Sequence, residues 1–124
     1  MKQILFRDLP VDMQQVAADI VDRYDLDDRP LPVHQFSLRR FPVLPCERNP
    51  DAFIRSEFMP YVEPMRQGIL PPVLVVGRVW IDGCHRVWAA RRLKLPTIPV
   101  IDLADAGIPA SAVSNYDRIA TLTS

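Results

Sequence analysis

The chain has 124 residues, 48% of them hydrophobic, and its 15 basic residues balance its 15 acidic residues. A chain of this length and composition can bury a sizeable core in one compact domain without disulfides or metal ions. The balanced charge argues against binding of nucleic acid or membrane through net charge, so any such role needs a local surface. We therefore expect a single domain over residues 1–124.

The charges separate along the chain. Seven aspartates occur in the first quarter, at Asp8, Asp12, Asp19, Asp22, Asp25, Asp27 and Asp28. Cations gather in the second half, at Arg78, Arg86, Arg91, Arg92 and Lys94. This pattern predicts a regional basic surface.

The cysteine content and the hydropathy pattern indicate where the protein works. Only Cys46 and Cys84 occur, the N-terminus has no apolar leader, and no apolar run approaches the roughly 18 residues that span a bilayer. We expect a cytoplasmic protein that does not interact with membranes.

The first half of the chain predicts a helix and a strand, followed by helical pieces. Apolar residues at helical spacing predict a helix over residues 10–24, and alternation predicts a strand over residues 33–40. Prolines then predict an irregular connection. Asn49-Pro50-Asp51 is typical of a helix start, Pro60 is expected to break that helix, and a second short helix is expected over residues 60–67, ending at Gly68.

The second half gives the clearest structural signal. Residues 73–76 and 79–81 are β-rich and are joined by Gly77-Arg78, which predicts a type II′ hairpin. Residues 87–94 predict a helix, and residues 97–101 a short strand with its proline at an edge or another tolerated position. A last helix is expected from about Pro109, and the core from about residue 33 to residue 102.

The hexapeptide Ile81-Asp82-Gly83-Cys84-His85-Arg86 lies between the hairpin and the helix. A helix start favours anions, glycine permits close approach of a phosphate, and an arginine fork matches phosphate oxygens. We expect an oxyanion site at Gly83, His85 and Arg86. Two alternatives stay open: Gly83 supplies a positive φ for a tight turn, and Arg86 pairs with Asp82.

Three residues of the hexapeptide are candidate catalytic groups. The helix start, His85 and Arg86 would favour the thiolate of Cys84 as a nucleophile, although a small packed residue is the alternative. His85 is a candidate acid or base. Asp82 would cap the helix, which is the common case, bind a metal or orient His85. The two histidines and distant cysteines give no zinc spacing, so we expect no metal site built by the protein alone. The general base stays unassigned among carboxylates such as those of Glu57, Glu63 and Asp82.

Two tryptophans and four cations near the hexapeptide are further candidates for binding. Trp80 and Trp88 would stack a base or lie in the core. A candidate nucleic-acid surface, with a solvated helix face as the alternative, comprises Arg78, Arg91, Arg92 and Lys94.

The hexapeptide carries a family resemblance. Pro72-Val73-Leu74-Val75, then Ile81-Asp82-Gly83-Cys84-His85-Arg86-x-x-Ala89-Ala90, then Ile98-Pro99-Val100 resembles the ParB/sulfiredoxin superfamily, over about residues 33–102. The resemblance implies a small α+β domain in which a strand, a helical insertion, a β-hairpin and a signature helix build a nucleotide-phosphate site. It implies ATP or CTP, with Mg²⁺, as the cofactor.

Two branches of that superfamily are similar to different parts of the motif. Gly83-Cys84-His85-Arg86 is similar to the sulfiredoxin signature, which implies ATP-dependent thiol chemistry at Cys84, although Asp82 and Ile81 replace that family's glycine and aromatic residue. Asp-Gly-x-His-Arg resembles ParB-like nucleases and free-serine-kinase-like proteins, which implies nuclease or phosphoryl-transfer activity. The chain lacks the second phosphate motif and the helix-turn-helix of partition proteins. A non-catalytic adaptor that binds DNA or a protein is the third reading.

Overall fold

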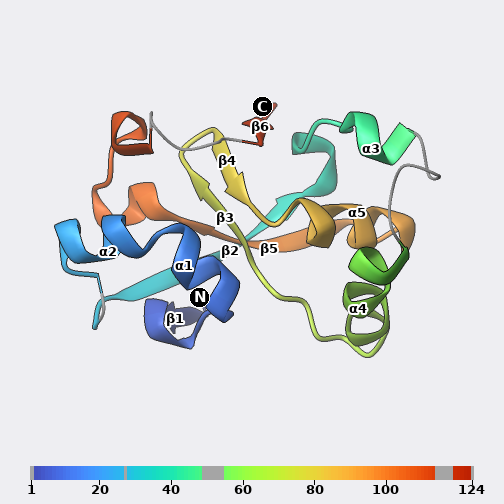
Figure 1. Cartoon of the computed structure of the whole chain (residues 1–124), viewed down its shortest axis with the longest axis horizontal. Coiled ribbons are helices and arrows are strands. Elements are labelled where there is room, and N and C mark those ends of the chain that lie inside the picture. Colours follow the sequence, from blue (N-terminus) through green and yellow to red (C-terminus); the bar gives the residue numbers. More distant parts are fainter. Residues whose placement is uncertain (1, 27, 49–54, 114–118, 124) are drawn as a thin grey trace.

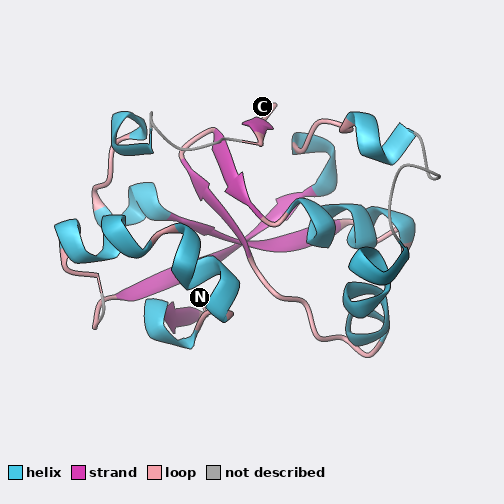
Figure 2. Cartoon of the chain, viewed as in Figure 1, coloured by secondary structure: helices cyan, strands magenta, loops and turns pink. Residues whose placement is uncertain are grey.

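The computed structural model describes residues 2–26, 28–48, 55–113 and 119–123. These residues form a mixed six-stranded sheet with helices packed on both faces (Figures 1 and 2). The strand order is β1-β2-β5-β3-β4-β6, in which β3 and β5 are parallel and the other neighbours antiparallel. This architecture confirms the predicted α+β class.

The element bounds are as follows. The strands are β1 (Gln3–Leu5), β2 (Pro30–Ser37), β3 (Val73–Val76), β4 (Val79–Asp82), β5 (Thr97–Asp102) and β6 (Ala120–Thr121). The α-helices are α1 (Val11–Val16), α2 (Ala18–Tyr24), α3 (Pro45–Arg48), α4 (Arg55–Arg66) and α5 (Cys84–Arg92). Short 3-10 helices are η1 (Phe6–Asp8), η2 (Leu38–Arg40), η4 (Leu103–Ala106) and η5 (Ala110–Val113).

The sheet separates two hydrophobic cores, because successive side chains of a strand point to opposite faces. On β3, Val73 and Val75 pack into the core that also contains α4 and α5 residues. Leu74 and Val76 pack into the other core, with residues of α1 and α2. Figure 1 shows these two helix pairs on opposite sides of the strands. Phe6 and Leu122 belong to the cores, so residues on both sides of the 33–102 stretch also pack in them.

The predicted helix over residues 10–24 is two helices. Ala17 has φ −110° and ψ 14°, which interrupts the helix between α1 and α2. Ala17 is fully buried, as are Met13 and Ile20 on either side of it. The interruption thus keeps the apolar residues of both helices in one core, which the helical periodicity alone does not specify.

The prediction that Pro60 breaks the helix is wrong. Helix α4 contains both Pro60 and Pro64. Its apolar face packs against α5 and buries Val62 and Met65, so tertiary packing offsets the loss of backbone hydrogen bonds. The predicted end is correct: Gly68 has φ +86°, and the N–H of Ile69 donates to Pro64 O at 2.9 Å. The expected start at residues 49–51 lies outside the described residues.

The hairpin is confirmed, and the surrounding strands differ from expectation. Gly77 has φ +61° and Arg78 has no positive φ, which fits the type II′ turn. Strand β2 begins at Pro30 and gives way to η2 at Leu38, earlier than expected at both ends. The connection expected to be irregular contains α3. The described start of the helix expected from about Pro109 is the 3-10 helix η5, and residues 114–118 lie outside the described residues.

Strand β5 is central, so an edge position for its proline is wrong. Pro99 is buried and lies opposite Gln35 of β2, while pairing with β3 begins one residue later, at Val100. The proline therefore lies where β5 has not yet met β3, which is a tolerated position. The short edge strands β1 and β6 had no sequence signal, because three and two residues are too few to show alternation.

Candidate functional site

The hexapeptide begins with a β-bulge. Leu74 of β3 lies opposite Asp82, whereas Val75 lies opposite Trp80, so Ile81 is an extra residue in β4. The indole N–H of Trp80 donates to Asp82 O at 3.0 Å and fixes the end of the strand. The bulge turns the chain from the sheet into helix α5.

Gly83 makes the turn possible. Its φ is +103°, and a Cβ built there would lie 3.0 Å from Cγ2 and 3.3 Å from Cα of Val73. A side chain at this position is opposed both by the left-handed backbone and by the close approach of β3. Gly83 therefore supplies the positive φ of a tight turn, as the alternative hypothesis stated. Contact between Gly83 and a phosphate stays a prediction.

Helix α5 begins at Cys84, one turn earlier than the helix expected from residue 87. Gly83 is the N-cap residue, so the expected capping by Asp82 is wrong. The first helical bond in this region runs from the N–H of Val87 to Gly83 O at 3.1 Å. The backbone N–H groups of Cys84, His85 and Arg86 precede that bond and point toward the start of the helix, where the helix dipole is positive.

His85 is half-buried and meets an aromatic ring from α4. The imidazole and the ring of Tyr61 are stacked, with 6.0 Å between centroids and 2° between planes. The Sγ of the half-buried Cys84 lies 3.8 Å from Nδ1 of His85. Tyr61 was missed by the sequence analysis, because its place beside the hexapeptide depends on how α4 packs against α5.

Arg86 is buried, with 4% of its surface exposed. Its Nη1 lies 3.8 Å from Oδ2 of Asp82, and its guanidinium lies over the Tyr61 ring, 5.4 Å from the centroid. The structure therefore contains the Asp82 pair that was the alternative to anion binding. Direct contact between Arg86 and an anion from solvent stays a prediction.

The four cations expected to bind nucleic acid have different surroundings. Arg91 is half-buried, donates to Phe41 O at 3.1 and 3.2 Å, and pairs with Glu47 at 3.0 Å. Arg92 and Lys94 are exposed at the end of α5. Arg78 is exposed at the hairpin turn, away from that helix end.

The tryptophans and the remaining carboxylates do not add a binding surface beside the turn. Trp80 is fully buried and packs edge-on against Phe41, and Trp88 is 6% exposed. Both therefore match the core alternative. Glu63 is exposed on α4 and pairs with Arg66 at 2.8 Å. The side chain of Glu57 is not among the side chains that the structure describes.

Metal ligands and membrane spans were sought among the described residues. In that part of the chain, no three His, Cys, Asp or Glu side chains are grouped so that they could hold a metal ion. Nor does that part contain a helix long and apolar enough to cross a membrane.

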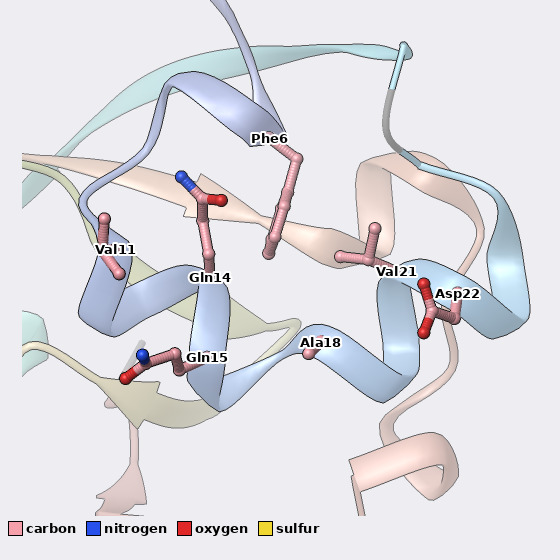
Figure 3. A pocket seen from close by; sticks show the side chains of 7 residues that line it. All are labelled: Phe6, Val11, Gln14, Gln15, Ala18, Val21 and Asp22. Atoms are coloured by element: carbon pink, nitrogen blue, oxygen red, sulfur yellow. The ribbon is translucent and has the colours of Figure 1, made fainter.

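Two pockets lie away from the turn. One, of about 280 Å³, is lined by residues of η1, α1 and α2, among them exposed Val11 and buried Phe6 (Figure 3). The other, of about 210 Å³, is lined by Val43, Glu47, Trp88, Arg91 and Arg92. Neither pocket has a local signal in the sequence, because each is formed by segments that meet only in the fold.

Comparison of the chain with protein-family models, with curated proteins and with solved structures found no match in any of the three. The ParB/sulfiredoxin resemblance therefore rests on the motif residues and on the order of the elements.

Proposed function

We propose that this chain is a nucleotide- or nucleic-acid-phosphate-binding domain of the ParB/sulfiredoxin type, with the phosphate at the start of α5. The observation that carries the proposal is the arrangement around Gly83: three backbone N–H groups precede the first helical bond, and His85 is partly exposed in the same turn. Such a helix start favours anions.

The other residues of the turn have supporting roles in this proposal. Arg86 contributes its positive charge from behind the turn and holds Asp82 at 3.8 Å, while Tyr61 fixes the plane of the imidazole. The order β2, α3 and α4, β3–β4, α5 is the order that the resemblance implies. A cytoplasmic location and a bound ATP or CTP with Mg²⁺ belong to the same proposal.

The reaction class that suits this site is phosphoryl transfer or phosphodiester hydrolysis. These reactions depend mainly on positioning and on stabilisation of negative charge, and a helix start with His85 supplies both. His85 is then the candidate acid or base, and Asp82 acts as the orienting carboxylate of Arg86.

Calorimetric titration with ATP, CTP and GTP at low salt tests the proposal. We expect one of them to bind, and His85→Ala to weaken binding roughly tenfold or more, the value of a charge-assisted hydrogen bond. Arg66→Ala, on the exposed face of α4, is the control and should bind as wild type. Absence of nucleotide binding, or equal effects of both substitutions, would reject the proposal.

The second candidate is thiol chemistry at Cys84. The observation that favours it is the 3.8 Å contact between Cys84 Sγ and His85 Nδ1 at a helix start, where a thiolate is stabilised. Alkylation by iodoacetamide, followed by mass spectrometry that separates Cys84 from Cys46, tests it. Cys84 should react faster than Cys46 at pH 7 and should slow in His85→Ala; equal rates would remove this candidate.

A further inference from the structure

Beyond the phosphate site, five cations lie on three segments that hydrogen bonds link in series: the β3–β4 turn, η2 and the end of α5. We define them as the basic surface, and its residues are Arg39, Arg40, Arg78, Arg92 and Lys94. We infer that this surface binds the backbone of double-stranded nucleic acid, separately from the start of α5.

Hydrogen bonds to the last described residues bring three of these arginines together. The N–H of Leu122 donates to Arg78 O at 2.7 Å, and Arg78 Nη2 donates to Leu122 O at 3.2 Å. The N–H of Thr123 donates to Arg40 O at 2.8 Å, and its hydroxyl donates to Arg39 O at 3.1 Å. Figure 1 shows the β3–β4 turn and the segment after β2 on either side of β6.

The end of α5 continues this surface. Leu38, which begins η2, donates its N–H to Pro96 O at 3.2 Å. This bond places Arg39 and Arg40, the next residues of η2, near the segment that follows Lys94. Arg91 ties the same segments together through Phe41 O. Because Glu47 pairs with Arg91, we leave Arg91 out of the binding set.

A solvated helix end does not account for this cluster. Cations at a helix C-terminus offset its dipole, which explains Arg92 and Lys94. Arg39, Arg40 and Arg78 lie on η2 and the hairpin turn, where no such dipole acts. Exposed aspartates lie on other segments, at Asp8, Asp19, Asp22, Asp25 and Asp28. The carboxylate of Asp102 lies closer to this surface, where it accepts from the N–H of Gly77 beside Arg78.

The chemistry of the surface favours a duplex backbone over a single strand. Four of the five cations are arginines, whose forks bind phosphate bidentately. Single strands are bound mainly by stacking bases on exposed aromatic rings. In the described part of this region, the Phe36 ring is covered by the Arg40 guanidinium at 4.0 Å and Trp88 is 6% exposed. The surface thus offers charge rather than stacking platforms.

Fluorescence anisotropy with a labelled duplex DNA, titrated at several salt concentrations, tests the inference. If about three to five phosphates are contacted, log K should fall with log salt with a slope of about −3 to −5. The double variant Arg39→Ala/Arg92→Ala should weaken binding at low salt about tenfold or more and reduce the slope by about two.

The matched control is Arg7→Ala/Arg23→Ala, which removes the same charge from exposed positions outside the basic surface. It should bind the duplex as wild type, and Arg39→Ala/Arg92→Ala should keep the wild-type affinity for nucleotide if the two sites are separate. Circular dichroism checks that each variant is folded. The inference is overturned if the duplex does not bind at low salt, if the control loses as much affinity, or if an equal-length single strand binds more tightly.

Discussion

The ring of Tyr61 on α4 lies parallel to the imidazole of His85 on α5, with 2° between the two planes. The contact joins α4, whose course through Pro60 the sequence did not predict, to the turn before α5, whose position the sequence did predict. It holds the one partly exposed imidazole of the hexapeptide in a fixed orientation. The stack therefore makes the proposed phosphate site depend on how the two helices pack.

Removal of this ring should weaken nucleotide binding. Aromatic pairs contribute about 0.5–1.5 kcal/mol, so we expect Tyr61→Ala to raise the nucleotide Kd roughly 2- to 10-fold. Tyr61→Phe keeps the ring and should leave Kd unchanged. Calorimetry at one salt concentration measures both, and equal Kd values for the two variants would show that the stack does not orient His85 for binding.

A side chain at Gly83 should destabilise the fold. Gly83→Ala places a methyl group 3.0 Å from Val73 Cγ2 at φ +103°, and backbone strain of this kind costs about 1–3 kcal/mol before the clash is added. Gly107→Ala is the control, because its φ is +83° and nothing lies within 4 Å of the added Cβ. Urea denaturation should show a larger loss in free energy of unfolding for Gly83→Ala than for Gly107→Ala. Equal losses would mean that Val73 moves away from the added methyl group at no cost in free energy.

The Asp82–Arg86 pair should show coupling in a double-mutant cycle. Breaking a buried pair leaves one charge uncompensated and costs about 3–5 kcal/mol. With Asp82 21% exposed and the atoms 3.8 Å apart, we expect the lower end for Asp82→Asn or Arg86→Met. The double variant should lose less than the sum of the two single losses in free energy of unfolding, and strict additivity would contradict an energetic link.

Lys94 occupies a position that suits glycine. It has φ +58°, and the N–H groups of Lys94 and Leu95 close the end of α5 on Arg91 O and Ala90 O. Lys94→Gly should therefore raise the thermal midpoint by the equivalent of about 1 kcal/mol. Lys94→Ala removes the same charge and keeps the strained φ, so a similar gain in that variant would assign the effect to charge instead.

Local patterns in the sequence were sufficient where neighbours along the chain determine the structure. The Gly77-Arg78 turn and the Gly68 helix end are correct because each depends on one backbone conformation that glycine favours. The split at Ala17 and the unbroken α4 were not predictable in this way. Both are decided by packing against segments distant in sequence, which overrides local preference.

The candidate site divides in the same manner. The position of the turn and the start of a helix beside it followed from the hexapeptide and its flanking runs. The burial of Arg86, the stack on Tyr61 and the engagement of Arg91 by Phe41 O depend on which surfaces α5 presents to α4 and η2. Residue types alone do not encode those orientations.

Backbone amide chemical shifts during titration with nucleotide test the phosphate site most directly. We expect the largest ¹H–¹⁵N changes at the amides of Cys84, His85 and Arg86, and smaller changes in His85→Ala. Inorganic phosphate at higher concentration should move the same amides. Saturable nucleotide binding that leaves these three amides unmoved, or no change with any nucleotide, would contradict it.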